Sequence, residues 1–170
     1  QVITIEDNTM PDVTVTAPAD ITLNVNGLCF VDLDPSNTGE GTPTYSDNCD
    51  LADTGLEYSD LIVDSVSTGC YSIIRTWTAM ATDSCGNANA DSDNQRIDIQ
   101  DQIAPSFAYL PVDTIECDLW IDGACDYDYL NSIGLATATD NCELFEVQVE
   151  CTPLSSACTD DYIIDYTAYD

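Results

Sequence analysis

The side chains in this sequence that can do chemistry are carboxylates and cysteines. Aspartate and glutamate together number 32, cysteine occurs nine times, and there is no histidine. Without histidine the sequence lacks Ser-His-Asp and Cys-His arrangements, histidine general bases and the usual zinc ligands. The chemistry that remains is cation binding by oxygen ligands, acid–base work by paired carboxylates, and disulfide formation.

Acidic and amide side chains concentrate in three short segments, which are residues 6–8 ahead of Pro11, residues 47–50, and Asp83 with Asn87. Ca²⁺ takes about six to eight oxygen ligands from such groups. These segments are similar to the acidic linkers of cadherin-like proteins, although the cadherin motif is incomplete. The alternative is a solvated acidic face, because no segment has the EF-hand spacing. The sequence predicts calcium as the only cofactor, with these ligands: Asp7, Asp47, Asp83, Asp101 and Asp140.

Paired carboxylates are also the machinery of glycoside hydrolysis. With 32 acids in 170 residues, close pairs are expected by chance. A catalytic pair also needs a cleft, and chemistry is carried by such sites and not by folds. A small sandwich repeat rarely offers one. We therefore interpret the protein as not being an enzyme.

The charge of the chain limits its partners. Two arginines, Arg75 and Arg96, and no lysine leave a net charge of −30. Nucleic acid needs a cationic face and is excluded, and an anionic membrane surface would repel this chain for the same reason. No apolar run reaches the roughly 18 residues of a membrane span, so we expect no membrane insertion.

The sequence contains two copies of one module. Residues 1–11 recur as residues 95–105, with the glutamine, both isoleucines, an aspartate and the proline in register. Residues 47–49, Asp-Asn-Cys, recur as residues 140–142, and residues 26–29 match residues 122–125. Such self-similarity indicates two tandem repeats of about 90 residues each.

Within each copy the apolar residues alternate with polar ones. Val13 and Val15 alternate with threonine, and Ile97 and Ile99 flank an aspartate. Period two is typical of half-buried strands, and turn clusters separate them at the intervals of a β-sandwich. A helix over residues 50–60 is only weakly indicated. The predicted fold class is all-β, with two immunoglobulin-like sandwiches, and Trp77 and Tyr166 are the expected large core residues.

Residues 71–87, which end in Thr82-Asp83-Ser84-Cys85-Gly86-Asn87, are followed by a strand at residues 96–99 and by Asp101 and Pro105. In this order and spacing the motifs resemble the hyalin-repeat family. The resemblance implies immunoglobulin-type modules of bacterial surface proteins and extracellular adhesins. Met80 and Ala81 depart from the pattern, because the second copy lacks them.

Nine cysteines without a CxxC pair indicate disulfides and therefore an extracellular or cell-surface location. The repeat register favours Cys29 with Cys70 and Cys49 with Cys85 in the first copy. In the second copy Cys125 and Cys158 correspond to the first of these pairs, and Cys117 and Cys151 are candidates for an additional bridge. Cys142 is left unpaired. Sequence alone leaves the connectivity open.

The two ends of the sequence are complementary. Residues 8–101 form the first predicted repeat, and residues 102–170 form a second one that lacks its final strand. Residues 1–7 match that missing strand and are a candidate donor strand, with Ile3 and Ile5 as the inward-facing assembly residues. Either the chain is a segment of a longer array, or subunits join head to tail.

These observations favour a structural subunit or repeat of an extracellular fibre or surface stalk. In this hypothesis the partners are other copies of the chain, assembled head to tail by strand complementation. The alternative is a calcium-stabilised adhesin module that binds a ligand.

Overall fold

The structure is a computed structural model that describes residues 1–67, 69–108, 125–132, 134, 137–144, 146–155 and 160–169. The chain divides into two compact units. Unit 1 contains Gln1–Val25 and Phe30–Gln100, and unit 2 contains Asn26–Cys29 and Asp101–Asp170. The part of the chain that the structure describes is mostly β, with 55% of it in strands, so the predicted all-β class is confirmed.

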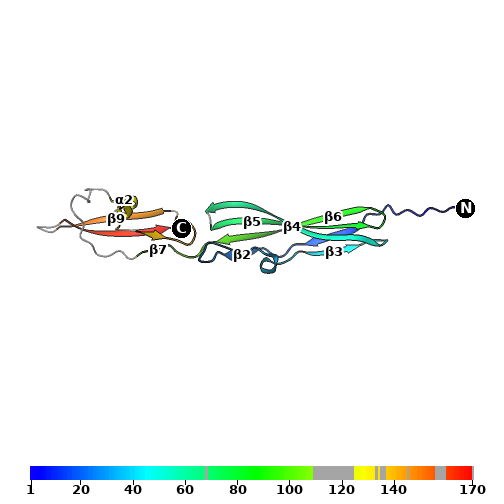
Figure 1. The fold of residues 1–170 in the computed structure, drawn as a ribbon, viewed down its shortest axis with the longest axis horizontal. Helices are drawn as coiled ribbons and strands as arrows, with labels where there is room; N and C mark the ends of the chain where they lie inside the picture. Colours follow the sequence, from blue (N-terminus) through cyan, green and yellow to red (C-terminus); the bar gives the residue numbers. More distant parts are fainter. Residues whose placement is uncertain are drawn as a thin grey trace. The chain divides into compact units, whose positions relative to one another are not determined.

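Unit 1 contains two sheets (Figure 1). One pairs β1 (Asp12–Thr16) with β3 (Thr42–Ser46) in antiparallel register. The other has the strand order β2-β6-β5-β4. Its antiparallel part consists of β4 (Leu51–Ser67), β5 (Cys70–Asp83) and β6 (Ala88–Gln100), and β2 (Ile21–Asn24) lies parallel to the end of β6. Residues 51–60 are therefore strand and not helix.

The core of unit 1 follows from the alternation seen in the sequence. Trp77 is 2% exposed and packs with Ala79 and Ala81 of β5 against Val13 and Val15 of β1. β-Branched and aromatic side chains suit such a pleated, half-buried surface. This cluster joins the two sheets into a sandwich.

Carboxylates of β6 also hold β1 in place. The backbone N–H of Val15 donates to Asp91 at 3.0 Å, and that of Ala17 donates to Asp93 at 2.9 Å. The two carboxylates thereby satisfy backbone donors of this segment, which matters because unpaired backbone groups are costly. The hydrogen bond from Ala17, followed by that from Asn94, lowers the pKa of Asp93.

A buried arginine lies in the same unit. Arg75 of β5 is 1% exposed, and its guanidinium binds both carboxylate oxygens of Asp60 at 2.8 Å. It also donates to the Thr38 hydroxyl and to the Leu33 carbonyl, both at 2.7 Å. Thr38 ends the one-turn helix α1 (Pro35–Thr38), which Asp34 caps by accepting from the Ser36 N–H. Arg75 therefore anchors the connection between β2 and β3.

In unit 2, β9 (Glu146–Ser155) pairs antiparallel with β10 (Asp160–Tyr169). A second pair joins β7 (Ser106–Phe107) to β8 (Ala138–Thr139). The short helix α2 (Tyr127–Ser132) contributes the buried Leu130. Phe107 lies 5.6 Å from the half-buried ring of Tyr166, whose desolvation raises its pKa.

The disulfides differ from those predicted. Cys29 bonds to Cys142, and Cys125 bonds to Cys151. The predicted pairs of Cys29 with Cys70, Cys125 with Cys158, and Cys117 with Cys151 are therefore wrong, as is an unpaired Cys142. The register argument assumed that each bridge closes within one sequence repeat, whereas residues 26–29 belong to unit 2 in space. Cys117 and Cys158 themselves lie outside the described residues.

Three cysteines of unit 1 are free thiols, namely Cys49, Cys70 and Cys85. The predicted bond between Cys49 and Cys85 is not formed, although the pKa of Cys49 responds to the charge of Cys85. Both thiols are exposed.

Residues 1–7 form no strand within a single chain, so their predicted role as a donor strand for a neighbouring repeat stays a prediction. The side chains of Val2, Ile3 and Ile5 are 92%, 76% and 92% exposed. A strand needs a hydrogen-bonding neighbour, and unit 1 already has β6, whose Ile97 and Ile99 are buried as expected. Within the described part of the chain, no helix has the length and apolar composition needed to cross a bilayer.

Candidate cation site at the acidic junctions

Three aspartates from distant parts of the sequence meet at one end of unit 1. Asp7 precedes β1, Asp47 follows β3, and Asp83 ends β5. One carboxylate oxygen from each lies within 4.8 Å of the others. Two ligands on opposite sides of a Ca²⁺ ion are separated by about twice its bond length of about 2.3–2.6 Å, so one ion can span this group.

Asp83 is the most deeply buried of the three. It is 2% exposed and accepts hydrogen bonds from the Cys85 N–H and from the backbone and side chain of Asn87, at 2.7–2.8 Å. Gly86, at φ 95°, supplies the positive φ of this turn, which few other residues adopt easily. Burial alone would raise the pKa of Asp83, but the hydrogen bonds from Asn87 and Cys85 outweigh it and lower the pKa. Asp83 is therefore held as an ionised ligand.

Asp7 is held by its own loop and by a neighbouring one. It accepts from the Thr9 N–H at 2.9 Å and from the Asn48 side chain at 3.2 Å, and its carbonyl accepts from Asn87 at 3.1 Å. The hydrogen bonds from Thr9, Cys49 and Asn48 lower the pKa of Asp7. The hydrogen bond between Asp7 and the Cys49 thiol, together with desolvation and the negative charge of Asp7, raises the pKa of that thiol to about 11.

Two oxygens of this cluster have no partner. Asp7 Oδ2 and Asp47 Oδ1 are both buried and accept no hydrogen bond. A buried anionic oxygen without a partner is costly, and the proximity of three carboxylates adds repulsion. The arrangement therefore offers unsatisfied anionic oxygens to a hard cation.

Unit 2 repeats this geometry. Asn141 donates to Asp101 as Asn48 does to Asp7, both at about the length of an ordinary hydrogen bond. The Cys142 N–H donates to Asp140 at 3.0 Å, as the Cys49 N–H donates to Asp47 at 3.0 Å. Asp140 Oδ1 and Asn141 Oδ1 are again buried without a partner. The sequence counterpart of Asp83 is Asp170, which lies outside the described residues.

The structure thus gathers Asp7, Asp47 and Asp83 into one cluster, and it links Asp101 to Asn141, the residue that follows Asp140 in the chain. Sequence reasoning missed the role of Asn48 and Asn141, which orient Asp7 and Asp101. The signal was present, because Asp-Asn-Cys recurs in both copies with the asparagine in register.

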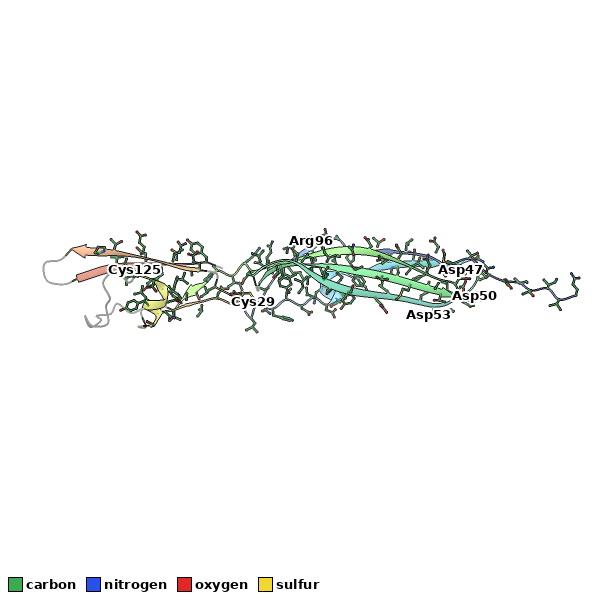
Figure 2. The ribbon with its side chains drawn as sticks, turned by 90° about the horizontal axis from the view of Figure 1, so that it is seen from above. Cys29, Asp47, Asp50, Asp53, Arg96 and Cys125 are labelled. Atoms are coloured by element: carbon green, nitrogen blue, oxygen red, sulfur yellow. A yellow bond between two sulfur atoms is a disulfide. The ribbon has the colours of Figure 1, made fainter. Side chains whose placement is uncertain are left out.

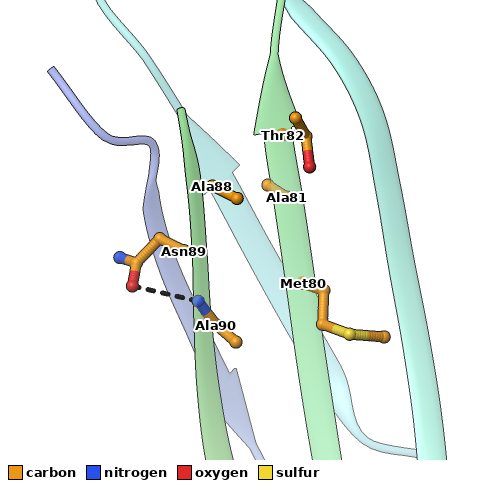
Figure 3. A pocket seen from close by; sticks show the side chains of 6 residues that line it. All are labelled: Met80, Ala81, Thr82, Ala88, Asn89 and Ala90. Atoms are coloured by element: carbon orange, nitrogen blue, oxygen red, sulfur yellow. Dashed lines mark hydrogen bonds between the residues drawn. The ribbon is translucent and has the colours of Figure 1, made fainter. Parts of the chain in front are cut away.

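A separate surface pocket lies on the hairpin of β5 and β6 (Figure 3). Met80, Ala81, Thr82, Ala88, Asn89 and Ala90 line its volume of about 420 Å³. The Asn89 side chain is engaged by the Ala90 N–H at 2.9 Å. This lining carries methyl groups and no titratable side chain, so it is not the place for the carboxylate chemistry considered above.

The fold and two acidic segments define the class of protein. It is an all-β, disulfide-bonded chain with a repeated acidic junction, formed by Asp7, Asp47 and Asp83 in unit 1 and by Asp101 and Asp140 in unit 2. Comparison with protein-family models, with curated proteins and with solved structures found no match. The resemblance to hyalin repeats and the immunoglobulin-like assignment therefore enter the proposal below.

Proposed function

We propose that this chain is a structural segment of an extracellular fibre or surface stalk, built from two immunoglobulin-like repeats of hyalin type. Residues 1–6 of one copy complete the sandwich of unit 2 in another copy. The role is mechanical and not enzymatic. The observation that carries the proposal is the exposure of Ile3 and Ile5, whose counterparts in β6 are buried.

The repeat register explains how residues 1–6 would bind. Gln1, Ile3 and Ile5 correspond to Gln95, Ile97 and Ile99, each of which is no more than 2% exposed. Gln95 donates to the Thr38 carbonyl at 2.6 Å and to the Ala19 carbonyl at 3.1 Å. The exposed segment therefore carries both the apolar and the polar elements of a closing strand.

Unit 2 offers a place for such a strand. β10 is the counterpart of β5, which has β4 on one side and β6 on the other. Among the described residues, β10 pairs with β9 alone. Residues 1–6 of another copy would pair with β10 on the side that β6 takes beside β5, and this pairing would satisfy the backbone groups of that edge.

A cation at each junction would stiffen such an array. The closing strand of unit 1 runs directly into Asp101, just as residues 1–6 run into Asp7. A cation held by Asp7, Asp47 and Asp83 ties the entering chain to the ends of β3 and β5. The disulfides support an oxidising, extracellular setting.

Calcium should stabilise unit 1 through this cluster. A ligand that binds only the folded state adds about 2.7 kcal/mol when its concentration is a hundred times its dissociation constant. We expect the melting temperature to rise when chelator is replaced by millimolar CaCl₂ at fixed ionic strength, as measured by calorimetry. Asp47→Asn should abolish most of the rise.

Asp53→Asn is the matched control, because Asp53 is an exposed aspartate near the same end of unit 1 (Figure 2). It makes the same change in net charge but leaves the cluster intact, so the calcium response should remain. An equal response in both variants would show that calcium only screens the surface charge.

Assembly should depend on Ile3 and Ile5. Replacing both by aspartate would bury two charges at positions that correspond to the buried Ile97 and Ile99, at several kcal/mol per site if they stay ionised. We expect purified wild-type chain to form head-to-tail oligomers, measured by light scattering and negative-stain microscopy, and the double variant to remain monomeric and folded.

Thr4→Asp is the control for this experiment. Thr4 corresponds to Asp98, which is half-buried between Ile97 and Ile99 in β6 and binds Ser72 at 2.6 Å. An aspartate is therefore accepted at this position of a closing strand, and assembly should persist. Oligomers that form equally well with Asp at positions 3 and 5 would refute strand complementation.

A further inference from the structure

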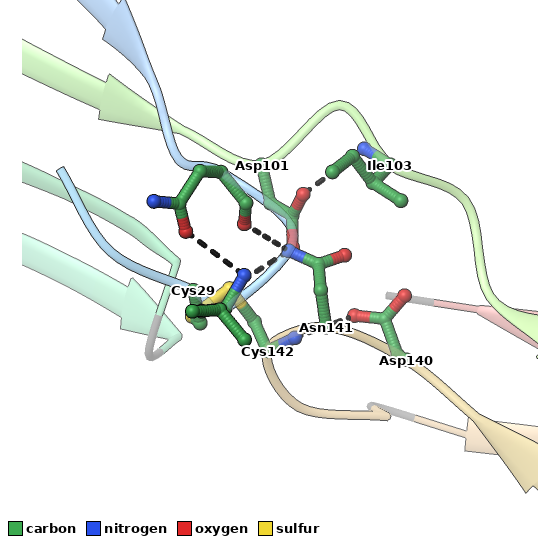
Figure 4. Close-up of a disulfide and its surroundings, with 8 residues drawn as sticks. Cys29, Asp101, Ile103, Asp140, Asn141 and Cys142 are labelled. Carbon is green, nitrogen blue, oxygen red and sulfur yellow. Dashed lines mark hydrogen bonds between the residues drawn. A yellow bond between two sulfur atoms is a disulfide. The ribbon is translucent and has the colours of Figure 1, made fainter.

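The disulfide between Cys29 and Cys142 joins segments that are far apart in the sequence (Figure 4). Cys29 belongs to residues 26–29, which follow β2 of the first sequence repeat but are part of unit 2. Cys142 belongs to the Asp-Asn-Cys segment of the second repeat. One repeat thus supplies a cysteine loop to the Asp-Asn-Cys segment of the next.

The Asp-Asn-Cys segment of unit 1 is built in the same way but lacks this partner. Cys49 has the position of Cys142, and its N–H makes the corresponding bond to Asp47. Cys49 is exposed and is a free thiol. The partner of Cys142 is Cys29, which lies in a loop of the preceding repeat. Cys49 should therefore bond to a cysteine in the same kind of loop.

The loop arrives together with the closing strand. The N–H of Val25, at the end of β2, donates to Gln100 at the end of β6 at 2.9 Å. Asn26 and Asp101, the residues that follow Val25 and Gln100, are also close to each other. The Asn141 side chain donates both to the Asn26 carbonyl at 3.3 Å and to Asp101 at 3.0 Å. A closing strand that reaches its junction therefore brings the neighbouring cysteine loop to the Asp-Asn-Cys segment.

We propose that Cys49 is an assembly site that forms a disulfide with Cys125 of a second copy of this chain. Cys125 is the sequence counterpart of Cys29 and is half-buried. This inference rests on the proposed head-to-tail array, in which residues 1–6 of one copy close unit 2 of the other. Non-covalent strand insertion would thereby become a covalent link between subunits.

The bond forms by thiol–disulfide exchange. The Cys49 sulfur attacks the Cys125 sulfur and forms the new bond between subunits, and the proton of the Cys49 thiol passes to the sulfur that leaves. The bond between Cys125 and Cys151 breaks, and the Cys151 thiolate leaves and takes up a proton. One disulfide replaces another, so the step needs no oxidant.

The test is to incubate purified chain without reductant, quench it with acid, alkylate the free thiols and analyse it on non-reducing gels. We expect a ladder of linked subunits that dithiothreitol removes, and a cross-linked peptide that contains Cys49 and Cys125. Cys49→Ser should lose the ladder. Cys85→Ser is the matched control, because Cys85 is also an exposed free thiol, and it should keep the ladder.

The outcomes separate this inference from the proposed function. The disulfide is overturned if wild-type chain gives no ladder, or if Cys49 is found bonded to Cys85. Strand complementation is left intact in either case if Cys49→Ser still forms filaments. A Cys49-dependent ladder that survives Asp at positions 3 and 5 overturns strand complementation and retains the disulfide. A ladder that Cys49→Ser does not change overturns the disulfide.

Discussion

Arg75→Met will lower the free energy of unfolding of unit 1 by about 3 kcal/mol, because breaking a buried ion pair leaves an uncompensated charge. Arg75 is 1% exposed, whereas the Asp60 side chain keeps 29% of its surface, and this places the expected value at the lower end for buried pairs. The loss also removes the donors to Thr38 and Leu33 and the guanidinium that lies 4.4 Å above the Tyr58 ring. Urea unfolding followed by tryptophan fluorescence measures the effect.

Arg96→Met provides the control, since it removes the other arginine and makes the same change in net charge. The Arg96 side chain is 40% exposed and binds Asp64 and Asp98 at the surface. Exposed ion pairs contribute little to stability because solvent screens them, so this variant should stay close to wild type. Equal losses in the two variants would mean that net charge, and not the buried pair, sets the stability.

Trp77→Ala should destabilise unit 1 by about 3–5 kcal/mol, because it removes the largest core side chain and leaves a cavity. The indole packs against Val13 and Val15, and its ring centre lies 5.2 Å from that of Tyr58. Thermal unfolding by circular dichroism measures the loss. A second substitution tests whether the geometry around the ring is the cause.

Gly41 is buried directly against the indole, and a Cβ built on it would lie 2.8 Å from Trp77 Cδ2. Gly41→Ala should therefore cost about 1–3 kcal/mol by overpacking. In the Trp77→Ala background the clash is gone, so the same change should cost much less, and the two effects should not add. Additive losses would show that Gly41 acts through its backbone and not through Trp77.

Several elements could be predicted from the sequence because their signals are local. The alternation at Val13 and Val15 and at Ile97 and Ile99 predicted strands with those side chains buried, and the structure confirms this. Gly86 lies in the Asp83 to Asn87 turn at φ 95°, a conformation that most residues avoid, so the glycine is itself a local signal. Period-two patterns survive in the fold because a strand places alternate side chains on opposite faces.

The burial of polar side chains was harder to predict from the sequence, although these residues follow the same alternation. Arg75 lies between Ile73 and Trp77 on the inward face of β5, and Gln95 precedes Ile97 on that of β6. A charged residue at an inward position predicts burial only if a partner is available. That partner, Asp60, comes from β4, and its pairing with β5 depends on register.

The disulfides could not be predicted by aligning the two sequence repeats. Sequence register equates residues within copies, but a covalent bond depends on which atoms meet in space. Cys29 lies close to Cys142, with a Cα–Cα distance of 4.8 Å, because residues 26–29 leave unit 1 and join unit 2. Sequence separation of 113 residues carries no hint of this proximity.

The sequence by itself determined the all-β class, the internal repeat, the acidity and the identity of the aspartates that meet at the first junction. These properties depend on composition and on short-range periodicity, which are written along the chain. Only the tertiary structure decided that Asp7 Oδ2 and Asp47 Oδ1 are buried without partners, that Arg75 is an internal ion, and which cysteines bond. Each of these depends on distances between segments far apart in sequence, and such distances are set by the packing of the sheets.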